Sequence, residues 1–270
     1  MDSLQRIAQW PVDHAAGAVV STGRGVREEA GDVERVYPLA SVTKLLVGYA
    51  VLVAIEEGAV ELDQPAGPPG STVRHLLAHA SGLAFDENRV QTAPGTKRIY
   101  SSAGFEVLAD FVAEESGIAF ADYLAEAVFA PLRMETAALA GPAGHGAQAS
   151  VRDLTAFAKE LCAPTLVSTE LFAEATSVQF PELAGILPGY GMHKPNDWGL
   201  AFEIRSEKHP HWTGTENSPR TYGHFGQSGT FLWVDPAAEL SCVVLTDRAF
   251  GDWAKPLWTD VSDGVLRQFR

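Results

Sequence analysis

One uncharged apolar segment, residues 45–55, constrains the fold of this chain more than any other stretch. It lies within a predicted helix over 41–57, which Gly58 should end because glycine is common just past a helix C-terminus. The apolar residues leave this helix almost no polar face, so other elements must cover it on all sides. A membrane-spanning helix needs about 20 apolar residues, and this segment is shorter. The sequence therefore predicts a buried central helix and no membrane span.

Strand-like segments lie near both ends of the chain, and segments with helical periodicity lie between them. Strands are predicted at 15–20 and 33–39, joined as a hairpin by a glycine turn, and at 199–204, 221–234 and 240–246. Helices are predicted at 73–80, 102–115, 120–130, 151–161 and 253–269. This order predicts an α+β fold. We expect residues 1–60 and 190–270 to form the sheet domain, with residues 61–189 inserted as a helical domain.

The composition excludes several classes of partner. The 270 residues include 34 acidic and 20 basic ones, a formal charge of −14. Nucleic acid and anionic membranes would be repelled, because no run of Lys or Arg makes a basic patch. Residues 1–6 lack a basic leader followed by an apolar stretch, so we expect a cytoplasmic protein. Cys162 and Cys242 have no paired spacing, and we expect both to be buried, reduced packing residues.

The first candidate for chemistry is the pair Ser41 and Lys44 at the start of the central helix. Positions i and i+3 share a helix face, so the hydroxyl and the amine can come within hydrogen-bonding reach. A desolvated Lys there should have a lowered pKa, as a general base near neutral pH requires. The plainer alternative is that Ser41 only caps the helix, although a capping box would have Glu or Gln at position 44. From the numbers of Ser and Lys, about 0.36 such pairs arise by chance, so the spacing alone is weak evidence.

Two further segments strengthen this candidate. Tyr100 lies just ahead of a predicted helix, where a phenol can face a cleft and shuttle a proton. Alternatively it is a hydrophobic anchor with a solvated hydroxyl. Residues 222–230 are rich in glycine, which weakens a strand unless another backbone or a ligand approaches closely. Such an edge can pair with a substrate amide and offer a backbone N–H to an oxyanion.

Together these segments resemble the motifs of the serine β-lactamase and penicillin-binding-protein superfamily: Ser-Val-Thr-Lys at 41–44, Tyr-Ser-Ser at 100–102 and His-Phe-Gly at 224–226. The resemblance extends to residues 39–44, 57–63, 73–83 and 223–226 and spans nearly the whole chain. It is greatest to the branch of class C β-lactamases, D-aminopeptidases, DD-carboxypeptidases and lactamase-like esterases. The resemblance implies a β-lactamase/transpeptidase-like α+β fold, with an antiparallel sheet flanked by helices and an inserted all-helical domain.

The resemblance also implies roles for individual residues. Ser41 would attack a carbonyl, with Lys44 and Tyr100 sharing the acid and base work and with no metal or cofactor. The N–H groups of Ser41 and Gln227 would form the oxyanion hole, and Ser102 and the edge at His224 and Gly226 would bind substrate.

Two positions depart from the family pattern. Ser102 stands where the second motif has Asn, so an amide that would hold a substrate's side-chain amide is lost. His224 stands where the third motif has Lys, as in the esterase and D-aminopeptidase members. A neutral His224 can donate one hydrogen bond but lacks the cation that pairs with a β-lactam carboxylate. The chain is also short for the class C group.

These departures favour a small ester or amide as substrate, of the esterase or D-amino-acid peptidase type, with weak β-lactam hydrolysis. One alternative is a true β-lactamase or DD-carboxypeptidase. Another is a degenerate penicillin-binding module, which Ser102 favours and which the intact Ser41, Lys44 and Tyr100 argue against. The expected partner is a small ester, amide or β-lactam molecule, and the sequence does not indicate an oligomeric state.

The remaining histidines give weaker signals. His75 and His79 are spaced to face one Zn²⁺, but the Glu that follows the first His of a metalloprotease is replaced by Leu76. We therefore expect both to be packing residues. His209 and His211 lie in a polar loop, where we expect them to be solvated. The sequence has no nucleophile elbow, P-loop or dinucleotide fingerprint.

Overall fold

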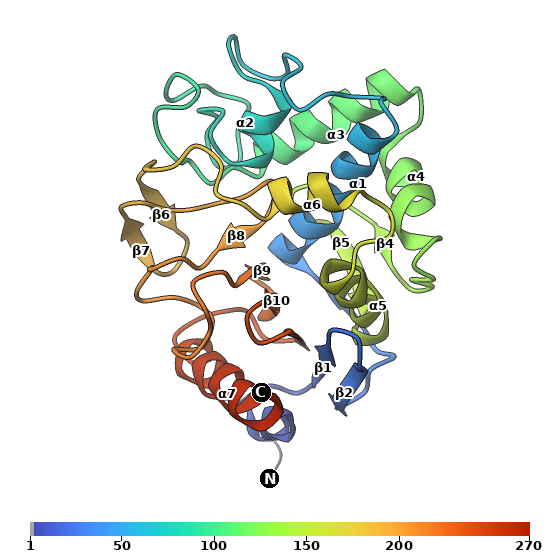
Figure 1. Ribbon diagram of the computed structural model, residues 1–270, viewed down its shortest axis with the longest axis vertical. Coiled ribbons are helices and arrows are strands. Elements are labelled where there is room, and N and C mark those ends of the chain that lie inside the picture. Colours follow the sequence, from blue (N-terminus) through green and yellow to red (C-terminus); the bar gives the residue numbers. More distant parts are fainter. Residues whose placement is uncertain (1–2) are drawn as a thin grey trace.

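The computed structural model describes residues 3–270, and its central feature is a six-stranded antiparallel sheet (Figure 1). The strand order is β2-β1-β11-β10-β9-β8. These strands are β1 (Ala15–Ser21), β2 (Gly25–Ala30), β8 (Glu203–Ile204), β9 (Tyr222–Gly226), β10 (Thr230–Asp235) and β11 (Leu240–Thr246). β1 pairs with β11 along its whole length. The two ends of the chain therefore build one sheet, in agreement with the predicted α+β fold.

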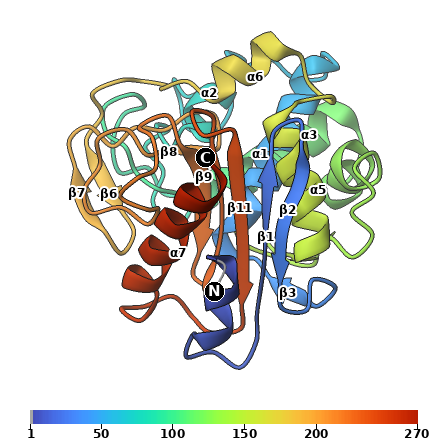
Figure 2. The ribbon, with the colours of Figure 1, turned by 60° about the horizontal axis from the view of Figure 1, so that its bottom comes forward.

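Helices cover both faces of this sheet. On one face lie α7 (Ala254–Phe269) and the 3-10 helix η1 (Leu4–Gln9), in front of the strands in Figure 2. On the other face α5 (Val151–Cys162) packs against β1, β10 and β11. Because successive residues of a strand point to opposite faces, Phe231 and Trp233 of β10 join the core beneath α7, while Leu232 joins the core on the opposite face. The sheet thus separates two hydrophobic cores.

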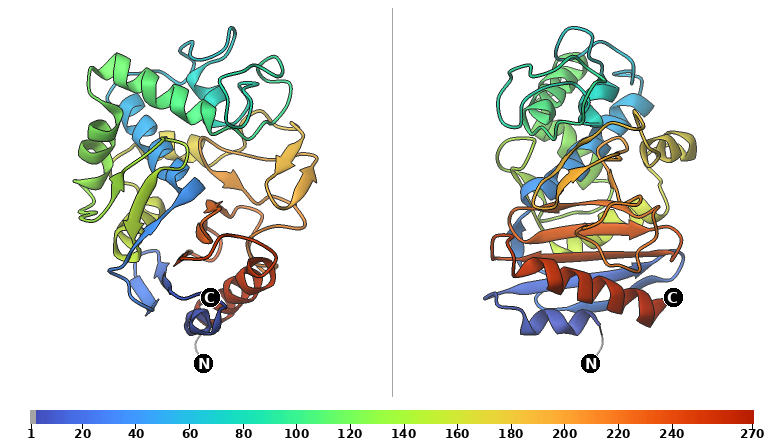
Figure 3. Two further views of the ribbon diagram at one scale, coloured as in Figure 1. Left: turned by 180° about the vertical axis from the view of Figure 1, so that it is seen from behind. Right: turned by 90° about the vertical axis from the view of Figure 1, so that its left-hand side faces the viewer.

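The remaining elements lie mostly on the α5 side of the sheet or beside its β8 edge (Figure 3). The helical ones are η2 (Ala40–Val42), α1 (Thr43–Glu56), α2 (Val73–Leu77), α3 (Ala103–Ser116), α4 (Phe120–Leu124), the π-helical η3 (Ala125–Phe129) and α6 (Thr169–Ala175). A small sheet has the order β3-β5-β4, and a separate hairpin pairs β6 with β7. Their bounds are β3 (Val36–Pro38), β4 (Ala138–Leu139), β5 (Ala147–Ser150), β6 (Gly185–Leu187) and β7 (Gly191–His193).

The predicted central helix is confirmed. Residues 43–54 of α1 are all buried, and the helix packs against α3, α4, η3 and β9. Gly58 has a φ of +75°, a left-handed conformation that suits glycine just past a helix end. One detail differs from the prediction, because Ser41 lies in the preceding 3-10 turn η2 rather than in the helix itself.

Several predicted boundaries are wrong. The hairpin partner of β1 is β2, whereas the predicted strand 33–39 contributes only β3, which pairs with β5 far along the chain. The predicted strand 221–234 is two strands, β9 and β10, joined by a turn in which Gly229 has a φ of +79°. Only β8 forms within 199–204, and the predicted helix 120–130 divides into α4 and η3. Glycine turns and long-range pairing, which periodicity does not reveal, account for the strand differences.

The predicted division into residues 1–60 plus 190–270 and residues 61–189 stays a prediction. α5 belongs to the second stretch by sequence, yet it packs directly on the sheet. Both thiols are free: Cys242 is buried in β11, while Cys162, expected to be buried, is partly exposed at the end of α5. Across residues 3–270, no helix has the length and apolar character needed to span a bilayer. Residues 1 and 2, part of the segment predicted to lack a leader, lie outside the described residues.

Candidate active site

Ser41 is partly exposed in η2, at the entrance to α1. Ala40 before it has a φ of 46°, a left-handed conformation that costs a non-glycine residue free energy. The end of β9 packs against this turn: a Cβ on Gly226 would lie 2.3 Å from the Leu39 carbonyl oxygen. The Thr230 hydroxyl donates to the same oxygen at 2.9 Å. The glycine-rich strand therefore does allow a close backbone approach, and it brings the end of β9 to Ser41.

Lys44 is fully buried near the start of α1. Its Nζ donates to Ser102 Oγ at 3.0 Å and to the Gly144 carbonyl oxygen at 2.7 Å, and it lies 4.7 Å from the centre of the Tyr100 ring. Burial lowers the pKa of Lys44 to about 7, although the nearby Glu106 carboxylate opposes this shift. A substantial fraction of the amine is therefore unprotonated at neutral pH and can accept a proton.

The Tyr100 side chain lies beside both Ser41 and Lys44. Its hydroxyl forms a hydrogen bond with the Ser41 side chain. Burial raises the pKa of Tyr100 above its ordinary value, and the hydrogen bond to Ser41 only partly opposes this. The phenol therefore stays protonated at neutral pH. The fold brings Ser41, Lys44 and Tyr100 together, and within this group Lys44 is the residue able to act as a base.

His79 holds the backbone on both sides of Tyr100. Its carbonyl oxygen accepts the N–H of Ile99 at 3.0 Å, and its Nδ1 accepts the N–H of Ser101 at 3.1 Å. Since a backbone N–H only donates, Nδ1 carries no proton and the proton is on Nε2. The His79 ring also lies 4.7 Å from the Tyr100 ring. His79 is thus a buried packing residue, while His75 forms a separate hydrogen bond with Thr72.

Arg98, two positions before Tyr100, also binds backbone groups, and sequence reasoning did not identify it. The buried guanidinium donates to four carbonyl oxygens, those of Ala78, Gln179, Phe180 and Asn196. Burial lowers the pKa of Arg98 to about 10, so it remains charged. A Lys-Arg pair in a loop is typical of a solvated surface, and nothing in the sequence shows that the backbone encloses it.

Ser102 contacts Lys44, and its expected role in binding substrate stays a prediction. Loop 141–146 packs directly on it, because a Cβ on Gly144 would lie 2.8 Å from Ser102 Cβ. Glu106 in the first turn of α3 accepts the N–H groups of Ala143 at 2.9 Å and Gly144 at 2.7 Å. The small side chain at position 102 thus leaves room for a backbone carbonyl beside the Lys44 amine.

His224 is buried in β9, and its Nδ1 lies 2.6 Å from the Phe225 carbonyl oxygen. That oxygen can only accept, so Nδ1 carries the proton and Nε2 keeps a lone pair. Within residues 3–270, Nε2 has no hydrogen-bond partner. Burial and the charge of Lys44 lower the pKa of His224 to about 3, so the ring is neutral. The one hydrogen bond that the neutral ring was expected to donate goes to the backbone, and the free Nε2 can accept a hydrogen bond but cannot donate one.

A buried ionic cluster, missed by sequence reasoning, lies on the strand next to His224. Glu203 of β8 is paired with Gly223 of β9. Its carboxylate contacts Lys208 Nζ and accepts from His211 Nε2 and Trp212 Nε1, each at 2.9 Å. Burial alone would raise the pKa of Glu203, but His211 and Lys208 outweigh burial and lower it.

This cluster corrects one prediction about the polar loop. His211 is buried rather than solvated, because its bond to Glu203 offsets the cost of desolvation, whereas His209 is exposed. In the printed sequence, a Glu, a Lys and a His within ten positions are the only signal of this network.

Gln227 directly follows β9 and is exposed. Its carbonyl accepts the N–H of Phe250 at 2.8 Å, and its side chain donates to the Phe250 carbonyl at 3.2 Å. Gly226 packs on the turn that carries Ser41, so the backbone of the next residue, Gln227, lies close to that turn. The oxyanion role of the Ser41 and Gln227 N–H groups stays a prediction.

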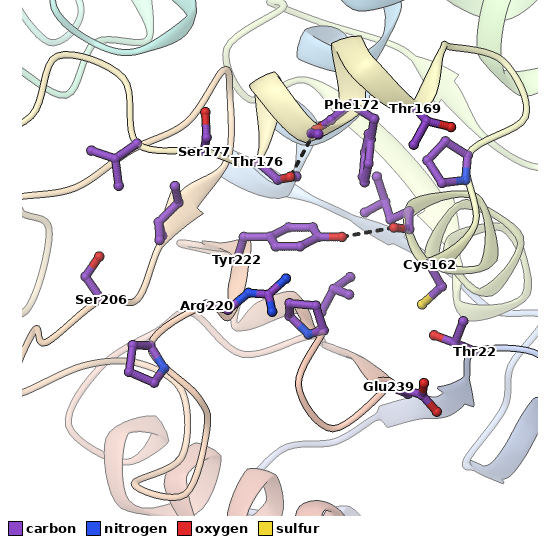
Figure 4. Close-up of a pocket in the computed structure, with 18 residues that line it drawn as sticks. Thr22, Cys162, Thr169, Phe172, Thr176, Ser177, Ser206, Arg220, Tyr222 and Glu239 are labelled. Carbon is purple, nitrogen blue, oxygen red and sulfur yellow. Dashed lines mark hydrogen bonds between the residues drawn. The ribbon is translucent and has the colours of Figure 1, made fainter.

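Two cavities of similar volume lie away from Ser41. One of about 600 Å³ lies at the other end of β9, against Tyr222 and Phe172 (Figure 4). Another of about 590 Å³ follows α7. A smaller one of about 380 Å³ begins at Ser102 and is lined by Glu106 and Asp110. In the part of the chain that the structure describes, no three His, Cys, Asp or Glu side chains are grouped so that they could hold a metal ion.

Comparison with known proteins identifies the family. Residues 7–262 match the family model described as Beta-lactamase. The chain belongs to the β-lactamase family. A crystal structure of a beta-lactamase (Mb2281c) from Mycobacterium bovis is 57% identical in sequence, with a TM-score of 0.98 and 99% of each chain covered. Both the predicted family and the β-lactamase-type fold are confirmed.

More distant matches include a solved structure and two curated proteins. EstCE1, described as a hydrolase with promiscuous acyltransferase activity, shares the fold at 16% identity, with a TM-score of 0.79 over 98% of this chain and 96% of its own. Among curated proteins, the carboxypeptidase/endopeptidase AmpH of Escherichia coli is 25% identical over 150 residues, 42% of this chain and 38% of that protein. The D-aminopeptidase of Brucella canis is 47% identical over 113 residues, 42% of this chain and 17% of that protein. The matches thus cover less than two fifths of these two relatives.

Proposed function

We propose that this β-lactamase-family protein is a serine hydrolase that cleaves small esters or amides through an acyl-enzyme at Ser41. The observation that carries the proposal is the hydrogen bond between the hydroxyls of Ser41 and Tyr100, beside a buried Lys44 whose pKa is about 7. A serine hydroxyl is a weak nucleophile until a neighbouring base takes its proton. A base works best when its pKa lies near the operating pH.

In the acylation step, Ser41 Oγ forms a bond to the substrate carbonyl carbon while its proton passes through the Tyr100 hydroxyl to Lys44. The carbonyl oxygen becomes an oxyanion, which the N–H groups of Ser41 and Gln227 stabilise. The bond from carbon to the leaving alcohol or amine then breaks, and the leaving group takes the proton back from Lys44 through Tyr100. An ester between Ser41 and the acyl group remains.

Deacylation uses the same groups in the same order. A water molecule attacks the acyl carbon, and its proton passes to Lys44. The bond between the carbon and Ser41 Oγ breaks, Ser41 takes up the proton, and the carboxylic acid leaves. The raised pKa of Tyr100 suits this relay, because the phenol exchanges protons without storing charge.

The surroundings of His224 favour neutral substrates over β-lactams, which carry a carboxylate. His224 Nε2 offers a lone pair, so it cannot donate a charge-assisted hydrogen bond to a carboxylate. Lys208, the lysine of the neighbouring cluster, is already engaged with Glu203. The formal charge of −14 adds general repulsion of anions.

Hydrolysis of p-nitrophenyl butyrate by wild-type protein and by Lys44→Ala tests the proposal. Loss of the general base should reduce kcat/KM by about 100-fold or more. The control is Lys255→Ala, an exposed lysine paired with Asp252, which should retain wild-type activity. Equal rates for wild type and Lys44→Ala would contradict the proposal.

A true β-lactamase is the second candidate, because the Mycobacterium bovis relative at 57% identity is described as a beta-lactamase. Values of kcat/KM for a chromogenic cephalosporin and for p-nitrophenyl butyrate separate the two candidates. We expect the ester to be the better substrate. A preference for the cephalosporin of more than about tenfold, or about 1.4 kcal/mol in transition-state stabilisation, would favour the β-lactamase instead.

A further inference from the structure

The amine of Lys44 is oriented by groups outside its own helix. Two of its N–H bonds have acceptors, Ser102 Oγ at 3.0 Å and the Gly144 carbonyl oxygen at 2.7 Å. A neutral primary amine has two N–H bonds and one lone pair. With both N–H bonds engaged, the lone pair occupies the one remaining direction. These two acceptors therefore determine where Lys44 can take up a proton.

The Gly144 carbonyl is in turn held by Glu106. The two carboxylate oxygens accept the N–H groups of Ala143 and Gly144. The carboxylate therefore holds the loop next to the carbonyl group that accepts from Lys44. Charge-assisted hydrogen bonds of this kind are about twice as strong as neutral ones. One carboxylate thus fixes loop 141–146 at the residue that contacts the amine.

The small residues of the site fit this arrangement. A Cβ on Gly144 would lie 2.8 Å from Ser102 Cβ and 3.0 Å from its Cα. A larger side chain at either position would push the loop away from Lys44. With Ser rather than the family's Asn at position 102, there is room for the Gly144 carbonyl beside the Lys44 amine.

We propose that Glu106 is a positioning residue for Lys44, acting through the Gly144 peptide group, so that loop 141–146 aims the lone pair of the base. This inference rests on the proposed function of Lys44. Glu106 also acts on Lys44 electrostatically, because its negative charge raises the pKa of Lys44 against the effect of burial.

Asp110 provides a matched control. It lies four positions further along α3 and lines the same cavity, but it is exposed. The variants Glu106→Gln and Asp110→Asn remove the same charge from the same helix. Only the first one also removes an acceptor from the loop, because a Gln amide N–H cannot accept from the backbone.

The first readout is the titration of Lys44 by NMR in protein labelled with ¹³C at the lysine ε-carbon, with the Lys44 signal assigned by its absence in Lys44→Ala. We expect the Lys44 titration midpoint to move to lower pH in Glu106→Gln and to stay at its wild-type value in Asp110→Asn. An unchanged midpoint in Glu106→Gln, or an equal shift in both variants, would overturn the inference. This readout needs no substrate, so it separates failure of the inference from failure of the proposed function.

The second readout is kcat and KM for p-nitrophenyl butyrate on the alkaline plateau, where Lys44 is unprotonated. We expect kcat of Glu106→Gln to fall about tenfold with KM within about twofold of wild type, since a misdirected base affects the chemical step. If Glu106→Gln does not fold, Glu106→Asp keeps the charge but shortens its reach, and its plateau kcat should also fall. A wild-type kcat in a folded Glu106 variant would contradict the positioning role.

Discussion

Lys44 shows how a residue's chemistry follows from its neighbours. The sequence places it at the mouth of an apolar helix, which was sufficient to predict a lowered pKa, and burial lowers that pKa to about 7. The contacts of its amine with Ser102 and Gly144 could not be predicted, because these residues lie far along the chain and only tertiary packing brings them to the amine. The lowered pKa of the proposed base could thus be predicted from the sequence, whereas the orientation of its amine depends on tertiary contacts.

The pH dependence of the wild-type reaction follows from this pKa. Protonated Lys44 cannot accept the proton of Ser41, so kcat/KM should rise with pH through a midpoint near 7 and then level off. His224 cannot produce this midpoint, because its pKa is lowered to about 3. Rates of p-nitrophenyl butyrate hydrolysis between about pH 5 and 9, corrected for spontaneous hydrolysis, check the prediction. A fall in kcat/KM across this range would contradict it.

His79 offers a test of how Tyr100 is held. His79→Asn keeps an acceptor close to the position of Nδ1, and Asn tolerates the φ of 54° found here. His79→Leu fills similar space without an acceptor. We expect kcat to fall about tenfold in the Leu variant, with KM nearly unchanged, and to stay within about threefold of wild type in the Asn variant. Equal losses in both variants would show that the hydrogen bond to Ser101 does not position the tyrosine.

At the scale of elements, features that follow from the local sequence pattern were predicted, whereas features that depend on long-range pairing were missed. The burial of helix α1 was predicted because the helix has almost no polar face, and the close approach at Gly226 was predicted from glycine in a strand. The pairing of β3 with β5 was missed because the partners are distant in sequence. The loop after β8 appeared solvated because its residues are polar, although Glu203 and Lys208 satisfy one another in the interior.

The Glu203 cluster should contribute strongly to stability. Lys208→Met leaves the Glu203 carboxylate buried without its cation, which typically costs about 3–5 kcal/mol in the free energy of unfolding. The control Lys255→Met removes an exposed pair and should change that free energy by less than about 0.5 kcal/mol. Urea unfolding at pH 7 measures both values. Similar free energies for the two variants would contradict the assigned role of the cluster.

The same cluster has a defined pH dependence. His211 and Lys208 hold the pKa of Glu203 below its ordinary value. Its contribution is therefore present above the unfolded-state pKa of about 4.3 and is lost only as the pH falls further.

At the scale of the whole molecule, the pairing of β1 with β11 closes the chain into one sheet, and this could be predicted from strand signals at both ends. The charge of −14 is likewise a property of the whole sequence. It should repel anionic substrates before they reach the site, because unscreened repulsion extends over about 10 Å at 0.1 M salt. Charge thus adds a selectivity that no single residue accounts for.

Salt dependence tests this global effect. Raising the ionic strength from about 0.02 to 0.2 M should increase kcat/KM for an anionic cephalosporin, because screening weakens its repulsion. The value for neutral p-nitrophenyl butyrate should change by less than about twofold. A decrease for the cephalosporin would indicate instead that a local positive field at the site outweighs the net charge.

The central claim is that Ser41 is the nucleophile, and covalent labelling tests it most directly. Wild-type protein, heat-denatured wild type and Ser41→Ala are each incubated with a fluorophosphonate, and intact masses are measured before the adduct is mapped by peptide analysis. The account predicts one adduct on native wild type, located at Ser41, and none on the denatured protein or on Ser41→Ala. An adduct that persists in Ser41→Ala, or that maps to another residue of native wild type, would contradict it.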